Sequence, residues 1–163
     1  MSDMIPSHLF APPLAAMDGL QFRLVQTADF RPLQETCYAD RRAALFLDHF
    51  EQMMVWQGNG RACWLFIEHN GRLVGSGELI IYPHGAELAN LFVVPQYRGR
   101  GIGTAMIIVL SRIARHWQLT GLEIGVECQN ERALALYRRL GFVDDREVKL
   151  PGGETAVILH KTL

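Results

Sequence analysis

The feature that most constrains the fold is a glycine cluster placed between a strand pattern and a helix pattern. Glycines occupy alternate positions in the segment 98–103. The preceding segment 87–94 has the apolar pattern of a strand, and 104–117 repeats apolar residues at helical spacing. A strand that turns into a helix through glycines indicates a layered domain of sheet and helices.

The other hydrophobic patterns extend this order along the chain. Asn70 and Gly71 separate two strand patterns and predict a hairpin, because both central residues of a type I′ turn need positive φ. The whole order predicts an α+β domain, a mixed sheet with helices on both faces. Strands are predicted at 21–25, 62–68, 72–82, 87–94, 122–128, 142–150 and 154–161, and helices at 30–38, 41–56, 104–117 and 130–140.

Length and composition indicate one ordinary globular domain. The chain has 163 residues and a formal net charge of −1, so it lacks the basic excess of nucleic-acid or anionic-membrane binders. No apolar run reaches the ~20 residues that span a bilayer. We expect residues 1–19 to form an N-terminal arm and 20–163 a single domain. The arm lacks a basic n-region and is broken by prolines, so it is not expected to be a signal peptide.

The cysteines and histidines predict no metal site. Cys37, Cys63 and Cys128 lie far apart and form no CxxC pair, and the six histidines lack ligand spacing. Scattered cysteines in odd number are typical of reduced thiols, which favours a cytoplasmic protein.

The glycine-rich turn predicts an anion site. Glycines let the backbone approach a ligand without a Cβ, and the first amides of a helix are free to donate to an anion. The helix dipole adds about half a positive charge there, and Arg98 and Arg100 add charge at the edge. The segment lacks the GxxxxGK[ST] pattern of a P-loop, and Thr104 breaks the GxGxxG pattern of dinucleotide-binding domains.

Two motifs in register resemble a known family. The segment 93–104, with Arg98, Gly101 and Gly103, resembles the central motif of the GCN5-related N-acetyltransferase (GNAT) superfamily. A second block resembles the family pattern "N…A…LY…LGF" and lies one helix and one strand further on, as in the family; its residues are Asn130, Ala133, Leu136, Tyr137, Leu140, Gly141 and Phe142. The resemblance covers about residues 21–163. It implies a mostly antiparallel sheet of six to seven strands, flanked by about four helices and splayed between its central strands.

The resemblance also implies a donor and its binding residues. It implies acetyl-CoA as cosubstrate, with its pyrophosphate on the amides of 98–104 and its pantetheine arm along the backbone of 92–94. Asn130 would contact the same arm. The expected cofactor-binding residues are Phe92, Val93, Val94, Arg98, Gly99, Arg100, Gly101, Ile102, Gly103, Thr104 and Asn130.

Acyl transfer to an amine needs acid–base groups, because an alkylammonium of pKa about 10.4 is almost fully protonated at neutral pH. Tyr137 matches the family tyrosine and is the candidate acid for the leaving thiolate. Glu87, fourteen residues before Gly101, is the candidate base, acting directly or through water, with His84 as a second candidate. Trp56 is expected in the core or in the acceptor cleft.

The acceptor and the alternatives stay open at this point. A primary amine of a small molecule or a peptide N-terminus is expected, and the absence of a strong acidic patch in the sequence argues against polyamines. A homodimer is compatible with the apolar arm. The alternatives are a non-catalytic acyl-CoA binding or sensing module on the same fold, and an unrelated nucleotide-binding domain.

Overall fold

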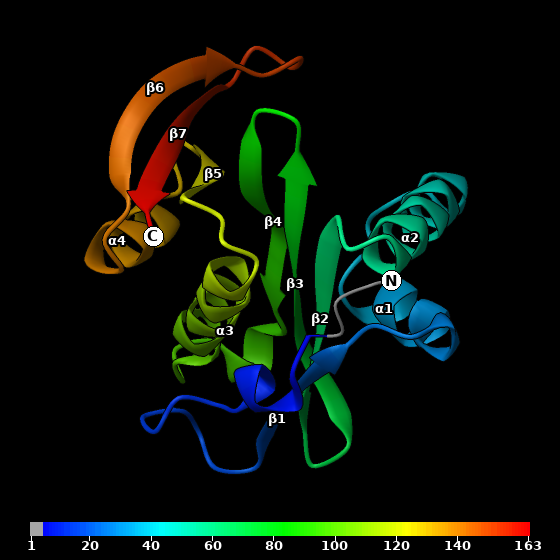
Figure 1. Ribbon diagram of the computed structural model, residues 1–163. Helices are drawn as coiled ribbons and strands as arrows, with labels where there is room; N and C mark the ends of the chain where they lie inside the picture. Colours follow the sequence, from blue (N-terminus) through cyan, green and yellow to red (C-terminus); the bar gives the residue numbers. More distant parts are fainter. Residues whose placement is uncertain (1–4) are drawn as a thin grey trace.

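The computed structural model describes residues 5–163, which form one seven-stranded sheet with helices on both faces (Figure 1). The strand order is β1-β2-β3-β4-β5-β7-β6. The strands are β1 (Leu20–Leu24), β2 (Ala62–His69), β3 (Arg72–Tyr82), β4 (Gly85–Val93), β5 (Gly121–Glu127), β6 (Val143–Lys149) and β7 (Thr155–Thr162). The helices are α1 (Phe30–Thr36), α2 (Ala43–Gly58), α3 (Ile102–His116) and α4 (Glu131–Arg139). The predicted α+β layered fold is therefore confirmed.

Each face of the sheet has its own core. α3 and α4 cover one face, where Met106, Leu110 and Ile113 of α3 are buried together with Tyr137 of α4. α1 and α2 cover the other face around Trp64, which is fully buried. The two helix layers lie on opposite sides of the sheet in Figure 1. Because helices cover both faces of the sheet, β2 and β3 are buried almost continuously rather than at alternate positions.

The sheet is splayed at its centre, as the resemblance implied. β4 and β5 are the parallel neighbours, and they pair at a single position, Glu87 with Glu123. The other strand pairs are antiparallel. Between the pairs Ser76–Phe92 and Glu78–Ala89, the single residue Gly77 of β3 faces two residues of β4, Asn90 and Leu91, so β4 has a bulge and bends here. The two strands therefore separate beyond Glu87 and leave space between them.

The glycine-rich turn follows β4 and begins α3 earlier than predicted. Gly101 is the N-cap of α3 with φ of 80°, a left-handed conformation that favours glycine, so the helix starts at Ile102 and not at position 104. Gly99 is also left-handed, with φ of 76°. β4 begins at Gly85, two residues before the predicted start.

The described part of the N-terminal arm lies against α3. A 3-10 helix at Ser7–Phe10 contacts this helix, and Arg112 of α3 donates a 2.7 Å hydrogen bond to the carbonyl of Ala11. Residues 1–4, the beginning of the predicted arm, lie outside the described residues. No helix of residues 5–163 is long and apolar enough to cross a membrane.

Candidate functional site

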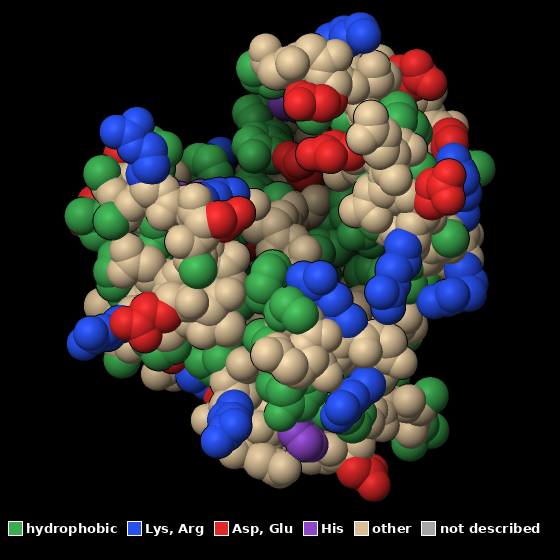
Figure 2. Space-filling model, turned by 180° about the vertical axis from the view of Figure 1, so that it is seen from behind, with side chains coloured by type: hydrophobic (Ala, Val, Ile, Leu, Met, Phe, Trp, Pro, Cys, Tyr) green, Lys and Arg blue, Asp and Glu red, His purple; other side chains and the backbone are tan. Residues whose placement is uncertain are grey.

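The separation of β4 and β5 opens into two adjoining cavities. One has a volume of about 880 Å³ and lies between α2, β4 and β5; the other has about 660 Å³ and lies between β4, α3 and α4. Leu91, Asn130, Ala133 and Tyr137 line both. Figure 2 shows the molecule from behind, with a hollow that has acidic side chains on its upper rim and basic ones below. The two cavities form one cleft with two chemically different halves.

The smaller cavity is basic and contains the glycine-rich turn. Arg98, Arg132 and Arg139 line it, and no Asp or Glu of the described chain does. The turn presents backbone without Cβ atoms at the N-terminus of α3, where the first amides lack helical acceptors. Donors and positive charge on one wall suit a pyrophosphate group.

Most of the predicted donor-binding residues meet in this cavity. Its lining includes Phe92, Val93, Arg98, Gly99, Gly101, Ile102, Gly103, Thr104 and Asn130. Val94 and Arg100 are not brought to it. The Val94 amide donates to the carbonyl of Val74 at 2.8 Å, so it is already used within the sheet. The Arg100 guanidinium lies over the Tyr97 ring, 5.3 Å from the ring centroid.

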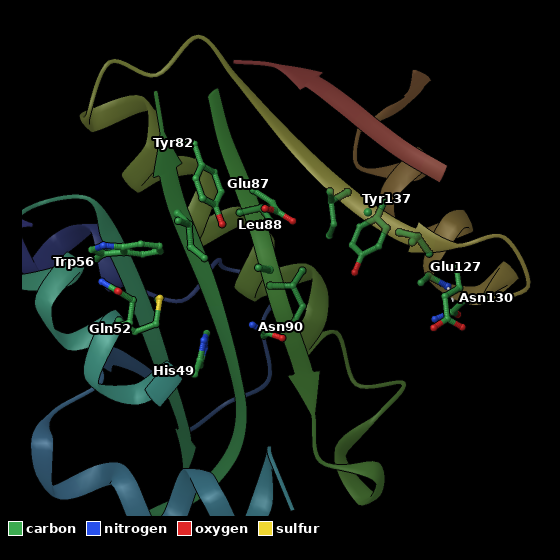
Figure 3. A pocket seen from close by; sticks show the side chains of 18 of the residues that line it. His49, Gln52, Trp56, Tyr82, Glu87, Leu88, Asn90, Glu127, Asn130 and Tyr137 are labelled. Atoms are coloured by element: carbon green, nitrogen blue, oxygen red, sulfur yellow. Dashed lines mark hydrogen bonds between the residues drawn. The ribbon is translucent and has the colours of Figure 1, made fainter. Parts of the chain in front are cut away.

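The larger cavity is acidic and aromatic. Asp48, Glu87 and Glu127 line it, and no Lys or Arg of residues 5–163 does. Trp56 and Tyr82 form an aromatic corner with ring centroids 6.3 Å apart. Figure 3 shows Trp56, Gln52 and His49 on α2 opposite Tyr137. This acidic surface could not be predicted from the sequence, because its members come from α2, β4 and β5 and meet only in the folded chain.

Tyr137 lies at the junction of the two cavities. Its side chain is buried, packs against Phe142 at 6.0 Å between ring centroids, and lines both halves of the cleft. Burial raises the pKa of the Tyr137 phenol. Its hydroxyl therefore keeps its proton at neutral pH and can donate it to a stronger base formed at the junction.

Glu87 lies on β4 at the last position paired with β5, and it lines the larger cavity. Partial burial raises the pKa of the Glu87 carboxyl, and the charges of Glu123 and Glu78 raise it further. A carboxylate with a raised pKa is a better proton acceptor at neutral pH. His84, the second candidate base, stacks on Tyr82 with centroids 5.9 Å apart and lines neither cavity.

A comparison with protein families decides the relationship. The model of the acetyltransferase (GNAT) family matches residues 26–142. This range includes both motifs and the residues that line the two cavities. The chain belongs to the GNAT family. The resemblance drawn from residues 93–104 and 130–142 is confirmed.

Individual GNAT relatives share limited identity with the chain. An uncharacterized N-acetyltransferase of Methanocaldococcus jannaschii is 41% identical over 64 residues, covering 39% of this chain and 28% of that protein. A putative [ribosomal protein bS18]-alanine N-acetyltransferase of Bacillus subtilis is 26% identical over 108 residues, covering 64% and 72%. The chain thus spans less than two thirds of the length of the first of these relatives.

The fold is also that of solved GNAT structures. A spermidine N-acetyltransferase from Vibrio cholerae, in complex with CoA and spermine, superposes with a TM-score of 0.72 at 20% identity, covering 90% of this chain and 96% of that one. At this identity the likeness shows the shared fold. Within residues 5–163, no group of three or more His, Cys, Asp or Glu side chains is placed to hold a metal ion.

One polar cluster beside the larger cavity was missed by the sequence analysis. The Glu78 carboxylate is fully buried and accepts hydrogen bonds from the Tyr38 hydroxyl at 2.7 Å, from His49 Nε2 at 2.7 Å and from Asn90 Nδ2 at 2.9 Å. The available signal was a single acidic residue, Glu78, in the middle of the predicted strand 72–82. A buried charge requires such partners, but the sequence alone does not say where they come from.

Proposed function

We propose that the chain is an N-acetyltransferase that moves an acetyl group from acetyl-CoA to a primary amine by direct attack, with both substrates bound together. The observation that carries this proposal is the single cleft with a basic half and an acidic half, joined at Tyr137. The basic half fits the phosphates of the donor, and the acidic half fits a cationic amine. Membership of the GNAT family supports the same reaction.

The donor would be held by the turn and the strand before it. The amides at Gly101, Ile102 and Gly103 would bind the pyrophosphate, and the guanidinium groups of the basic half would neutralise its charge. Backbone groups of Phe92 and Val93, next to the splay, would pair with the pantetheine arm, and Asn130 would contact it. Acetyl-CoA supplies the activated acetyl thioester.

Acid–base chemistry would come from Glu87 and Tyr137, on opposite sides of the junction. Glu87 would accept a proton from the attacking nitrogen, directly or through water, because burial raises the pKa of its carboxyl. Tyr137 would donate a proton to the leaving sulfur. Positioning of the amine beside the thioester would supply the larger share of the rate, up to about 7–11 kcal/mol of the barrier.

The acidic half favours an acceptor that arrives as a cation. Its carboxylates attract an ammonium group, and Trp56 and Tyr82 can contact a cation through their ring faces. A small amine, including a diamine or polyamine, or a peptide N-terminus meets this requirement. The bS18-alanine acetyltransferase and the spermidine acetyltransferase among the similar proteins are named for acceptors of these two kinds.

We further propose that residues 20–163 are the single catalytic domain and 1–19 an arm.

The competing function is an acyl-CoA binding module without catalysis, and turnover separates the two. The purified chain would be incubated with acetyl-CoA and a panel of monoamines, diamines, amino acids and short peptides, while thiol release and acetylated product are followed. Acetylation of cationic amines supports the proposed function. Binding of CoA without turnover of any amine would favour the binding module instead.

A further inference from the structure

The buried cluster around Glu78 adjoins the acceptor half of the cleft, and the reaction as described above leaves it unused. We propose that His49, held by Glu78, is a catalytic base that removes the proton from the incoming ammonium group. This inference rests on the proposed acetyl transfer to an amine, and it adds a residue that acts before the attack.

The hydrogen bonds determine which nitrogen of His49 is free. A carboxylate oxygen can only accept, so the Nε2 atom, 2.7 Å from Glu78 Oε1, carries the hydrogen. The Nδ1 atom then has a lone pair and no hydrogen-bond partner among residues 5–163. The buried side-chain atoms without a partner are His69 Nδ1 and Ser111 Oγ among the described residues, so His49 Nδ1 is not buried. His49 lines the larger cavity, and 22% of its side chain is exposed. The lone pair is therefore accessible from the acceptor half.

Glu78 is placed to stabilise the protonated form of His49. Its carboxylate is fully buried, and a buried anion is stabilised when a cation forms beside it. Tyr38 and Asn90 hold the carboxylate in place from two other directions. The base of a serine hydrolase triad also donates from one ring nitrogen to a buried carboxylate, although the two nitrogens have exchanged roles in His49.

The imidazole ring is also fixed by its neighbours. Its centroid lies 5.9 Å from that of Tyr38 and 5.5 Å from that of Trp64. The charged groups around the cluster are Asp48 on α2, Glu87 on β4 and Arg41, whose guanidinium donates to Asn90 Oδ1 at 2.8 Å. Packing and hydrogen bonds together leave the ring one orientation, which is what proton transfer requires.

The cluster lies close to the junction where the acetyl group would be. Asn90, which bonds Glu78, directly precedes Leu91, and Leu91 lines both cavities. Asn90 has a φ of 49°, so β4 is irregular at this point, and Asn90 itself lines the larger cavity. Figure 3 shows His49 and Asn90 on the same side of the cleft, opposite Tyr137.

The proton balance needs more than one base. The ammonium group gives one proton to His49 Nδ1, and the neutral amine attacks the thioester carbon. The C–N bond forms, and the C–S bond breaks with its electron pair passing to sulfur. The nitrogen gives its second proton to Glu87, and sulfur takes one from Tyr137, which later recovers a proton through solvent from Glu87. His49 releases its proton to water, so the net products are amide, CoA thiol and one proton.

The test compares two acceptors that differ in protonation. His49→Gln is assayed with ethylamine, an ammonium at neutral pH, and with trifluoroethylamine, which is largely neutral there. We expect kcat/KM for ethylamine to fall about 10²-fold. The factor by which kcat/KM falls for trifluoroethylamine should be at least about tenfold smaller, because the neutral amine needs no prior deprotonation. His116→Gln, at an exposed histidine that ends α3 outside both cavities, is the matched control and should leave both rates unchanged. Calorimetric titration with CoA checks that each variant is folded.

Glu78→Gln provides the second variant. It leaves His49 in place and removes the charge behind it, so it should show the same dependence on the acceptor. An equal loss with both amines, or no loss with either, in a variant that still binds CoA would overturn the proposal. Failure of the wild-type protein to acetylate either amine would instead contradict the proposed function, so the two failures are distinguishable.

Discussion

Replacement of Gly75 by alanine tests how closely β3 and β4 approach beside the donor site. A Cβ atom at Gly75 would lie 2.9 Å from the backbone carbonyl oxygen of Phe92, a separation that real Cβ atoms essentially never show. The obstructing atom belongs to the backbone of a paired strand, so it cannot move by a simple rotamer change. β4 must therefore shift at Phe92, where we propose that the pantetheine arm pairs.

The expected magnitude follows from two opposing terms. Overpacking in a core costs about 1–3 kcal/mol, and the loss of chain freedom in the unfolded state offsets about 0.4–1 kcal/mol. The net destabilisation should be about 1–2 kcal/mol, which lowers the Tm by about 2–8 °C for a chain of this size. Because β4 moves, the dissociation constant for CoA should also rise.

Urea unfolding and calorimetric titration measure the two effects, with Gly85→Ala as the control. Gly85 lies on β4, the strand that contains Phe92, but a Cβ there meets nothing within 4 Å. Gly85→Ala should be neutral or stabilising by about 0.4–1 kcal/mol. The reasoning is refuted if Gly75→Ala is as stable as the wild type and binds CoA equally well.

Three further variants test the site and its support. Tyr137→Phe keeps the packing and should lower kcat about 10²-fold or more, measured by thiol release, while the affinity for CoA stays unchanged. An unchanged kcat would exclude Tyr137 as the acid. Glu87→Gln should make the protein more stable near pH 8, but not near pH 4. The reason is that burial raises the pKa of Glu87, so its ionised form disfavours the folded state above that pKa. Urea midpoints at both pH values measure this, and a constant difference would contradict it. Burial opposes the ionisation of Asp29, but hydrogen bonds from Arg23 and from the Gln26 amide outweigh it and lower the pKa of Asp29. Ionised Asp29 therefore stabilises the folded state above the unfolded-state pKa, and this stabilisation is lost as the pH falls through the folded-state pKa. Asp29→Asn should lower the free energy of unfolding by about 1–2 kcal/mol near pH 7 and by little in strong acid, as urea unfolding curves would reveal.

The sequence was sufficient to predict the order of elements and the glycine-rich turn between β4 and α3. Local patterns determine both. Asn70 and Gly71 are adjacent residues that accept the positive φ of a hairpin turn, and Gly99 and Gly101 take left-handed conformations in the glycine-rich turn. The boundaries differed where a cap decides them, as at Ile102, which follows the left-handed Gly101.

The acceptor half could not be predicted, because it depends on contacts between distant segments. Tyr38 and His49 reach Glu78 across 40 and 29 residues, and their meeting depends on how α1, α2 and the segment between them pack on the sheet. A bulge in β4 shifts its register against β3 by one position, and no residue pattern indicates that shift in the sequence. The acidic lining of the cavity likewise arises from three separate elements.

Calorimetric titration of acetyl-CoA, ATP and NAD into the wild-type protein and into Gly101→Glu determines whether the glycine-rich turn binds the donor. Gly101 is left-handed in the turn, with φ of 80°, and glutamate there adds strain and a negative charge where we place the pyrophosphate. Gly153→Glu is the matched control, because Gly153 is also left-handed, with φ of 91°, and lies in the β6–β7 turn. We predict binding of acetyl-CoA in preference to ATP and NAD, lost in Gly101→Glu and kept in Gly153→Glu. Preference for ATP or NAD, or equal binding by both variants, would contradict the account.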